Sequence, residues 1–187
     1  MSVTELIPVE EYLSTVYSPD CDFVDGVLED RNVGERDHGL IQAALIVWFS
    51  ARRKELGIVV IPEQRVQVSS SRFRLPDVCV TLGLPDEQIY TTPPFLCIEI
   101  LSPLDQMGRV LAKIADYLNF GVPYVWVIDP RDRTAAVYTA SEAKPVNDGI
   151  LRTQNPDIAL PVSYTHLDVY KRQPVGRSAP SSRRRNR

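Results

Sequence analysis

Cysteine, histidine and long apolar runs are all scarce in this sequence, and each scarcity excludes a class of protein. The three cysteines, Cys21, Cys79 and Cys97, have no C-x-x-C spacing, so neither a disulfide framework nor a zinc site is expected. Two histidines exclude a histidine-rich metal site and disfavour a Ser-His-Asp triad. No apolar run approaches the roughly 18 residues of a membrane span, and the first residues are acidic, unlike a secretory signal. We therefore expect a cytoplasmic protein that makes no membrane contacts.

The remaining composition is that of an average soluble domain, with 44% apolar and 24% charged residues. The charges, however, divide the chain at about Pro161. Residues 1–161 contain 14 Lys and Arg against 23 Asp and Glu, a net charge of −9, whereas residues 162–187 contain seven Lys and Arg and one Asp, a net charge of +6. The two parts therefore have different chemistry.

The stretch 162–173 resembles a translated sequencing adapter. Its twelve residues are those encoded by a transposase mosaic-end sequence joined to its own reverse complement, as used in library preparation. The 14 residues after it include several Ser, Pro and Arg, and a basic nucleic-acid-binding tail is the functional alternative. We favour the artefact, and we predict one folded domain over residues 1–161 followed by an artefactual, disordered tail over residues 162–187.

Helical and alternating apolar patterns follow one another along residues 1–161. They predict a short helix that starts at 9–13 and stops before the turn at 18–20, a hairpin at 23–29 about the Asp25-Gly26 turn, and a helix at 38–56. Strands follow at 58–68, 76–81 and 95–101, then a helix from 110 that ends at Gly121, and strands at 124–130 and 134–138. Gly57 and Gly121 follow the two longer helices, as glycine often does at a helix end. This order predicts a single α/β domain in which helices lie against the faces of a sheet.

Two carboxylates are notable because they belong to apolar strands. Asp77 follows a proline at the start of one strand, and Glu99 lies in the middle of the nearly continuous apolar run 95–101. Such carboxylates repel each other and are costly to bury, so a fold that contains them usually holds a cation such as Mg²⁺ or shares a proton between them. The structural alternative is that Asp77 caps a turn and Glu99 forms an ion pair with Arg74 or Lys113.

Several motifs, in the same order, resemble the Uma-two family of putative restriction endonucleases, bacterial proteins of the PD-(D/E)xK nuclease superfamily. The motifs are RLPDV at 74–78, PPFLCIEILSP at 93–103, Lys113 with Tyr117, GVPYVWVIDP at 121–130 and, earlier, DFVDG at 22–26 and His38. The resemblance covers residues 9 to about 160. It implies a restriction-endonuclease-like mixed β-sheet flanked by helices, with a divalent-metal site that hydrolyses phosphodiester bonds.

The resemblance also implies roles for particular residues. Asp77 corresponds to the Asp of the PD element and Glu99 to the acidic residue that follows it. Both would bind Mg²⁺ or Mn²⁺ together with the Ile100 carbonyl. Leu101 stands where a standard member has its lysine, so Lys113 on the next helix is the expected catalytic lysine.

Three further residues are candidates for the rim of this site. Glu63 heads the strand before Asp77 and is the candidate third carboxylate ligand, with an exposed charge beside Pro62 as the alternative. His38 begins the long helix and is a candidate accessory residue, with a solvated histidine as the alternative. Arg74 is the candidate substrate contact, and Arg72 and Arg109 could add to the positive field.

The leading hypothesis is a metal-dependent endonuclease with nucleic acid, most simply DNA, as its partner. Its difficulty is the net charge of −9 over residues 1–161, because duplex binding depends on Lys and Arg that displace counterions from phosphates. The alternative is a non-catalytic nuclease-fold protein that acts as an interaction module, for example as a homodimer through the hairpin at 23–29. The enzyme is favoured because a fold kept only for packing has little reason to place Glu99 in an apolar strand.

Overall fold

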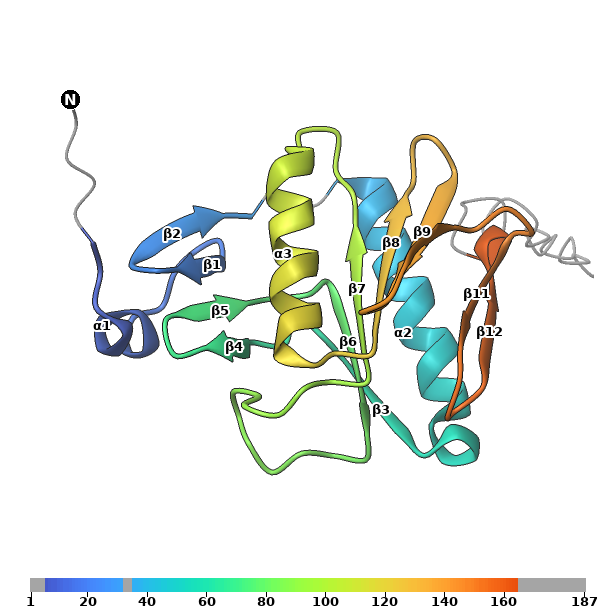
Figure 1. Ribbon diagram of the computed structural model, residues 1–187, viewed down its shortest axis with the longest axis horizontal. Coiled ribbons are helices and arrows are strands. Elements are labelled where there is room, and N and C mark those ends of the chain that lie inside the picture. The colour runs from blue at the N-terminus through green and yellow to red at the C-terminus, as the bar shows by residue number, and fades with distance from the viewer. Residues whose placement is uncertain (1–5, 32–34, 165–187) are drawn as a thin grey trace, which may run out of the picture.

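Six strands form the central sheet of the structure, a computed structural model that describes residues 6–31 and 35–164 (Figure 1). In sheet order they are β10 (Ala143–Pro145), β9 (Thr134–Tyr138), β8 (Tyr124–Asp129), β7 (Leu96–Ile100), β6 (Val78–Leu82) and β3 (Ile58–Pro62). β7 and β8 are parallel, and the other neighbours are antiparallel. The sheet is therefore mixed, as the sequence predicted, and helix α3 (Met107–Phe120) connects its two parallel strands.

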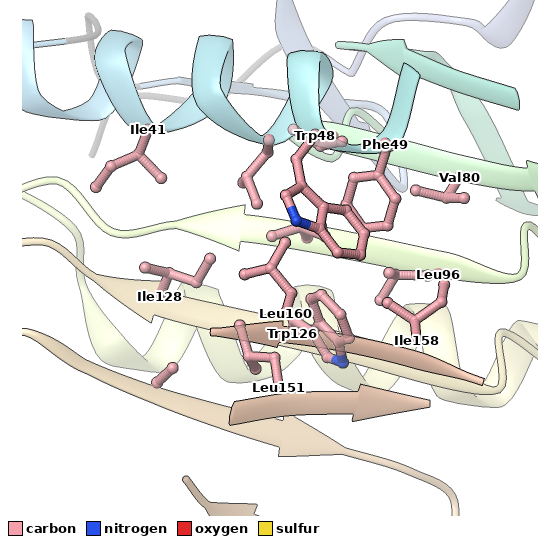
Figure 2. Close-up of a cluster of buried hydrophobic side chains, with 14 of the residues drawn as sticks. Ile41, Trp48, Phe49, Val80, Leu96, Trp126, Ile128, Leu151, Ile158 and Leu160 are labelled. Atoms are coloured by element: carbon pink, nitrogen blue, oxygen red, sulfur yellow. The ribbon is translucent and has the colours of Figure 1, made fainter. Parts of the chain in front are cut away.

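Helix α2 (Arg36–Leu56) covers one face of this sheet. Its buried residues recur at helical spacing, and it ends at Gly57, which adopts a left-handed conformation with φ 65°. Figure 2 shows Trp48 and Phe49 of α2 lying against sheet residues such as Leu96 and Trp126. The largest hydrophobic core of the described residues thus lies between α2 and the sheet.

Helix α3 covers the opposite face. Because side chains alternate along a strand, Leu96 and Ile98 of β7 belong to the α2 core, whereas Cys97 packs with α3 residues such as Ile114. Glu99 follows the same alternation and faces α3, where Lys113 and Tyr117 contact it. The register of β7 therefore decides that this carboxylate meets α3 and not α2.

A second sheet extends the α3 side of the molecule. Its order is β2 (Val27–Asp30), β1 (Cys21–Val24), β5 (Arg72–Arg74) and β4 (Val66–Ser69). The predicted hairpin is confirmed as β1 and β2, joined by Asp25 and Gly26, which both have positive φ. Phe23 stacks on Tyr12 of the short helix α1 (Val9–Ser14), with ring centroids 4.7 Å apart. The strand predicted at 58–68 is divided between the two sheets, because the chain turns at Glu63 with φ 51°.

A two-stranded hairpin of β11 (Ile150–Thr153) and β12 (Ile158–Pro161) completes the α2 core (Figure 2). The chain continues into a short 3-10 helix, Val162–Tyr164, and Val162 is 6% exposed within that core. The packed chain thus reaches beyond Pro161, while residues 165–187 of the predicted tail lie outside the described residues. Within the described part of the chain, no helix has both the length and the apolar character needed to cross a membrane.

Candidate active site

Six of the seven predicted site residues line one cavity at an end of the central sheet, and Arg74 does not. The C-terminal end of β7 and the first turns of α3 and α2 meet there, with the end of β2 beside them (Figure 1). They enclose a cavity of about 380 Å³. Its carboxylates are those of Asp20, Asp22, Glu29, Asp30, Glu63, Asp77, Glu99 and Asp105, and its permanent cations are Arg31, Arg109 and Lys113. Such a cavity attracts cations and repels phosphate groups.

Asp77, the residue just before β6, lies beside Glu99 of the neighbouring strand β7. Val78 of β6 pairs with Ile98 of β7 in antiparallel register, so the next residue along each strand places Asp77 opposite Glu99. An oxygen of the Asp77 carboxylate accepts the Ile100 N–H at 2.7 Å. The two residues are 5% and 6% exposed. The convergence that the sequence suggested is therefore present, and it occurs in a buried environment.

Three side chains hold Asp77 in place. Arg31 Nη2 lies 2.6 Å from Oδ1, His38 Nε2 lies 3.3 Å from Oδ2, and Gln42 donates to the Asp77 backbone carbonyl at 2.9 Å. Burial raises the pKa of Asp77, but the hydrogen bond from His38 and the charges of Lys113 and Arg31 outweigh it, so its pKa lies below the usual value. Asp77 is therefore ionised at neutral pH, and the candidate accessory residue His38 faces the site.

Two residues of α3, one turn apart, hold Glu99. Lys113 Nζ lies 2.9 Å from one carboxylate oxygen, and the Tyr117 hydroxyl donates to the other at 2.8 Å. Burial raises the pKa of Glu99 to about 7 although Lys113 lowers it, and Asp77 and Asp22 raise it further. Burial lowers the pKa of Lys113, but Glu99 and Asp22 raise it well above its usual value, so the ammonium stays charged. The structural alternative considered from the sequence included an ion pair between Glu99 and Lys113. This ion pair is present together with the pair of carboxylates Asp77 and Glu99.

Glu63 lies at the rim of the cavity, where β3 ends. Its side chain is 49% exposed, and its nearest cationic partner is Arg31, whose Nη1 lies 3.5 Å away. Its backbone N–H donates to the Asp77 carbonyl at 3.3 Å, which fixes the turn beside the site. Ile100 also lines the cavity. Both candidate ligands are therefore near Asp77, and their roles as ligands remain predictions.

Arg74 is buried among carboxylates and does not line the cavity. Its side chain is 2% exposed and is surrounded by three carboxylates at 2.6–3.2 Å, those of Asp22, Glu29 and Asp116. Arg72 pairs with Asp116 as well. A guanidinium committed to three carboxylates in the interior cannot also bind phosphate, so we correct its assignment from substrate contact to structural cation. Of the three arginines considered from the sequence, Arg109 lines the cavity.

The donor set fits a hydrated, hard cation. Among residues 6–31 and 35–164, no group of three or more His, Cys, Asp or Glu side chains is arranged to hold a metal ion. Mg²⁺, however, keeps several waters and typically uses one or two carboxylates together with oxygens of a bound phosphate. Asp77 and Glu99 beside the end of β7 are such a pair, and Mn²⁺ accepts the same oxygen ligands.

Two partners of Asp77 were missed by sequence reasoning. Arg31 and Gln42 reach it from 46 and 35 positions away along the chain, and no local pattern connects residues so far apart. The one available signal is that Arg31 is the only Lys or Arg in the acidic stretch 21–35. Tyr117 was given no functional role from the sequence, and its spacing of four from Lys113 was the signal that both side chains share one helix face.

Comparisons with known proteins bear on the fold. A family model, Uma2, described as a putative restriction endonuclease, matches residues 9–168. The crystal structure of a putative nuclease belonging to DUF820 from Anabaena variabilis ATCC 29413 is similar, with a TM-score of 0.74 and 22% sequence identity. The match covers 85% of this chain and 97% of that one, and at this identity it shows the fold alone. No curated protein matches the chain.

Proposed function

Since this chain belongs to the Uma2 family of putative restriction endonucleases, we propose that it is a metal-dependent endonuclease that hydrolyses phosphodiester bonds in DNA. A fold hosts many functions, so the proposal must stand on the site itself. The observation that carries it is the pair Asp77 and Glu99. Two opposed carboxylates that are almost fully buried, one of them paired with a lysine, are costly to build and typical of a site for cations.

The chain's own residues have distinct tasks in this chemistry. When bound, Mg²⁺ or Mn²⁺ would lower the pKa of a water molecule and neutralise charge on the phosphate. Asp77 is ionised and fixed by the Ile100 N–H, so it is a preorganised ligand. Glu99, with a pKa of about 7, must lose its proton to bind a cation. Lys113 stays charged and is placed to orient the attacking water or to neutralise the transition state.

The acidic cavity makes the order of binding part of the proposal. Carboxylates outnumber the cations that line it, so the phosphate backbone meets a repulsive field in the metal-free protein. A divalent cation at Asp77 and Glu99 reverses the local sign of this field. We therefore expect DNA to bind after the cation, and the cavity cations Arg109 and Lys113 to add to the attraction.

One observation favours a second function, a non-catalytic interaction module. Arg31 and Lys113 already neutralise Asp77 and Glu99, so the carboxylates are satisfied without a metal ion. A homodimer through the β1–β2 hairpin has less support, because Phe23 is 1% exposed. Val27 is the exposed large apolar side chain of the hairpin, at 36%, and it offers a partner little surface by itself.

Nicking of supercoiled plasmid DNA separates the two functions. The wild type should cleave with Mg²⁺ or Mn²⁺ and stop in EDTA, and Asp77→Asn or Glu99→Gln should lower the rate by at least about 100-fold. Asp132→Asn is the matched control, since this carboxylate is 66% exposed and lies in a surface turn. A folded wild type that cleaves neither DNA nor RNA with either cation would leave the interaction module as the function.

A further inference from the structure

Arg31 lies between two of the carboxylates proposed as metal ligands. Its Nη2 is 2.6 Å from Asp77 Oδ1, and its Nη1 is 3.5 Å from Glu63 Oε1. Its side chain is 14% exposed and lines the cavity. Burial by itself would lower the pKa of this guanidinium, but four carboxylates raise it, namely Asp77, Glu99, Glu63 and Asp22. Arg31 is thus a permanent charge inside the acidic cavity.

The Arg31 guanidinium contacts two carboxylates with one nitrogen each and does not bind a single carboxylate with both nitrogens. A guanidinium can bind a single carboxylate with two parallel N–H···O bonds, which is its most specific arrangement. Arg31 instead directs one nitrogen to Asp77 and the other towards Glu63. A divalent cation shared by these two residues would make the same bridge. The guanidinium and the cation are therefore alternatives at Asp77.

Lys113 contacts one of the proposed ligands, Glu99, whereas Arg31 contacts two of them. Lys113 lies between Glu99 and Asp22, at 2.9 and 3.5 Å, and Asp22 also accepts the Leu75 N–H and contacts Arg74. Lys113 is therefore held on the side of Glu99 that faces the buried arginine. Arg31 is therefore the cation that stands between two of the proposed ligands.

We infer that Arg31 is the internal counter-ion of this site, which neutralises Asp77 in the metal-free protein, yields it to a divalent cation, and then binds a phosphate of the substrate. The inference rests on the proposed metal site. The last step follows from chemistry, because a guanidinium released from Asp77 remains on the wall of the cavity and matches phosphate geometry. It would add a third positive group, beside Arg109 and Lys113, to a cavity that is short of them.

Calorimetric titration of Mg²⁺ into the full chain tests the first step. Arg31→Ala removes the competitor, so we expect Mg²⁺ to bind at least about tenfold more tightly than to the wild type. Arg31→Lys keeps a positive charge and should stay close to the wild type. Arg36→Ala removes the same charge from a residue that is 81% exposed and paired with Asp37, so its affinity for Mg²⁺ should be unchanged.

Thermal unfolding supplies a second readout. Asp77 loses its ion-pair partner in Arg31→Ala, so the metal-free variant should melt below the wild type. Saturating Mg²⁺ should raise its midpoint by more than it raises that of the wild type, since tighter binding gives greater stabilisation. If Arg31→Ala does not fold, Arg31→Gln, which keeps an amide donor, carries both measurements.

Binding of a fluorescein-labelled DNA duplex in Ca²⁺ tests the last step. Loss of one phosphate contact should weaken binding of Arg31→Ala and reduce the slope of log affinity against log salt by about one unit. Arg53→Ala, an exposed arginine in the last turn of α2, should keep the wild-type slope. If Arg31→Ala binds Mg²⁺ more tightly but keeps the wild-type salt slope for DNA binding, the proposed phosphate contact is overturned.

The outcomes distinguish this inference from the proposed function. Equal Mg²⁺ affinity in wild type and Arg31→Ala would overturn the role of Arg31 and leave the nuclease proposal standing. No Mg²⁺ or Mn²⁺ binding by either protein would overturn the metal site and the inference together. Tighter Mg²⁺ binding by Arg31→Ala, with an unchanged Mg²⁺ affinity in Arg36→Ala, supports the role of Arg31 as counter-ion. Removal of a merely structural arginine would not raise the affinity for Mg²⁺.

Discussion

Two neighbouring carboxylates at this site have opposite titration behaviour. The pKa of Asp77 is lowered because the hydrogen bond from His38 and two nearby cations outweigh burial, whereas burial dominates at Glu99 and raises its pKa to about 7. Environments that separate the pKa values of a close pair are typical of catalytic sites. At the scale of single residues, Asp77 is therefore the permanent anion of the site, and Glu99 is the group whose charge depends on pH.

This difference predicts that the metal-free protein loses stability as the pH rises through about 7. The pKa of Glu99 is raised from 4.5 in the unfolded chain to about 7 in the fold, so the folded state binds the proton more tightly. The resulting stabilisation is complete below the unfolded pKa and is lost as the pH passes the folded pKa. Urea unfolding at about pH 6 and about pH 8 measures this loss.

Glu99→Gln is the matched control for that measurement. Its amide cannot titrate, so the free energy of unfolding should depend less on pH than that of the wild type. Burial lowers the pKa of His38 and the hydrogen bond to Asp77 raises it above the usual value, so His38 acts in the same direction in both proteins. An equal loss in wild type and Glu99→Gln would mean that Glu99 does not titrate in this range.

Lys113 carries a second prediction at the residue scale. Lys113→Ala should not abolish Mg²⁺ binding, because an ammonium is not a ligand, but should lower the rate of DNA cleavage by about 100-fold or more. Leu101 lines the same cavity, so Leu101→Lys in the Lys113→Ala background should restore part of the rate. If the wild type is inactive and Lys113→Ala only destabilises the fold, Lys113 is simply the ion-pair partner of Glu99.

At the scale of elements, long periodic segments were predictable and short strands were not. The sequence located α2, α3 and the strands β6 to β9, since each contains enough apolar residues to show its period. It missed β5, β10 and the β11–β12 hairpin, which have three or four residues each. Their pairing is decided by distant partners, as when β5 joins β1 across the chain. The second sheet as a whole was not predicted for the same reason.

The site residues also divide into those that a local sequence pattern reveals and those that depend on distant partners. Asp77 and Glu99 were recognisable because they interrupt apolar strands, and Lys113 because it is the only lysine between residues 55 and 143. The contacts of Arg31 and Arg74 depend on how the second sheet meets the central one, which no local pattern encodes. Sequence reasoning therefore found the acidic residues of the site and misassigned one of the arginines around them.

Arg74 tests how the second sheet is attached to α3. Its guanidinium joins Asp22 and Glu29 of that sheet to Asp116 of α3 in the interior. Arg74→Met should therefore lower the free energy of unfolding by about 3–5 kcal/mol, because three carboxylates lose a buried partner. Arg72→Met, two residues away with a side chain 39% exposed, should cost about 1 kcal/mol or less. Equal losses in the two variants would contradict the structural role of Arg74.

At the scale of the whole molecule, we predict that the fold does not depend on the last part of the chain, residues 165–187. The described packing extends to Tyr164, with Val162 in the core, and the adapter-like residues continue beyond it. Residues 1–161 carry a net charge of −9, so the acidic body depends on bound cations for any contact with DNA. The function proposed here therefore rests on the domain and not on the basic tail.

Removal of residues 165–187 should leave the thermal midpoint unchanged. A chain that ends at Pro161 should melt a few degrees lower, because it also loses the buried Val162 side chain. Differential scanning calorimetry of the two shortened chains beside the full chain makes this comparison. A drop of several degrees on removing 165–187 alone would mean that the tail belongs to the fold.

The central claim is that Asp77 and Glu99 form one cation site, and calorimetric titration of Mn²⁺ tests it most directly. The wild type should bind Mn²⁺ with an affinity that falls as the pH drops below about 7, because Glu99 must be ionised. Asp77→Asn and Glu99→Gln should each abolish this binding, while both variants stay folded, since removing one of two close like charges relieves repulsion. Equal Mn²⁺ affinity in the wild type and in folded Glu99→Gln would contradict the claim.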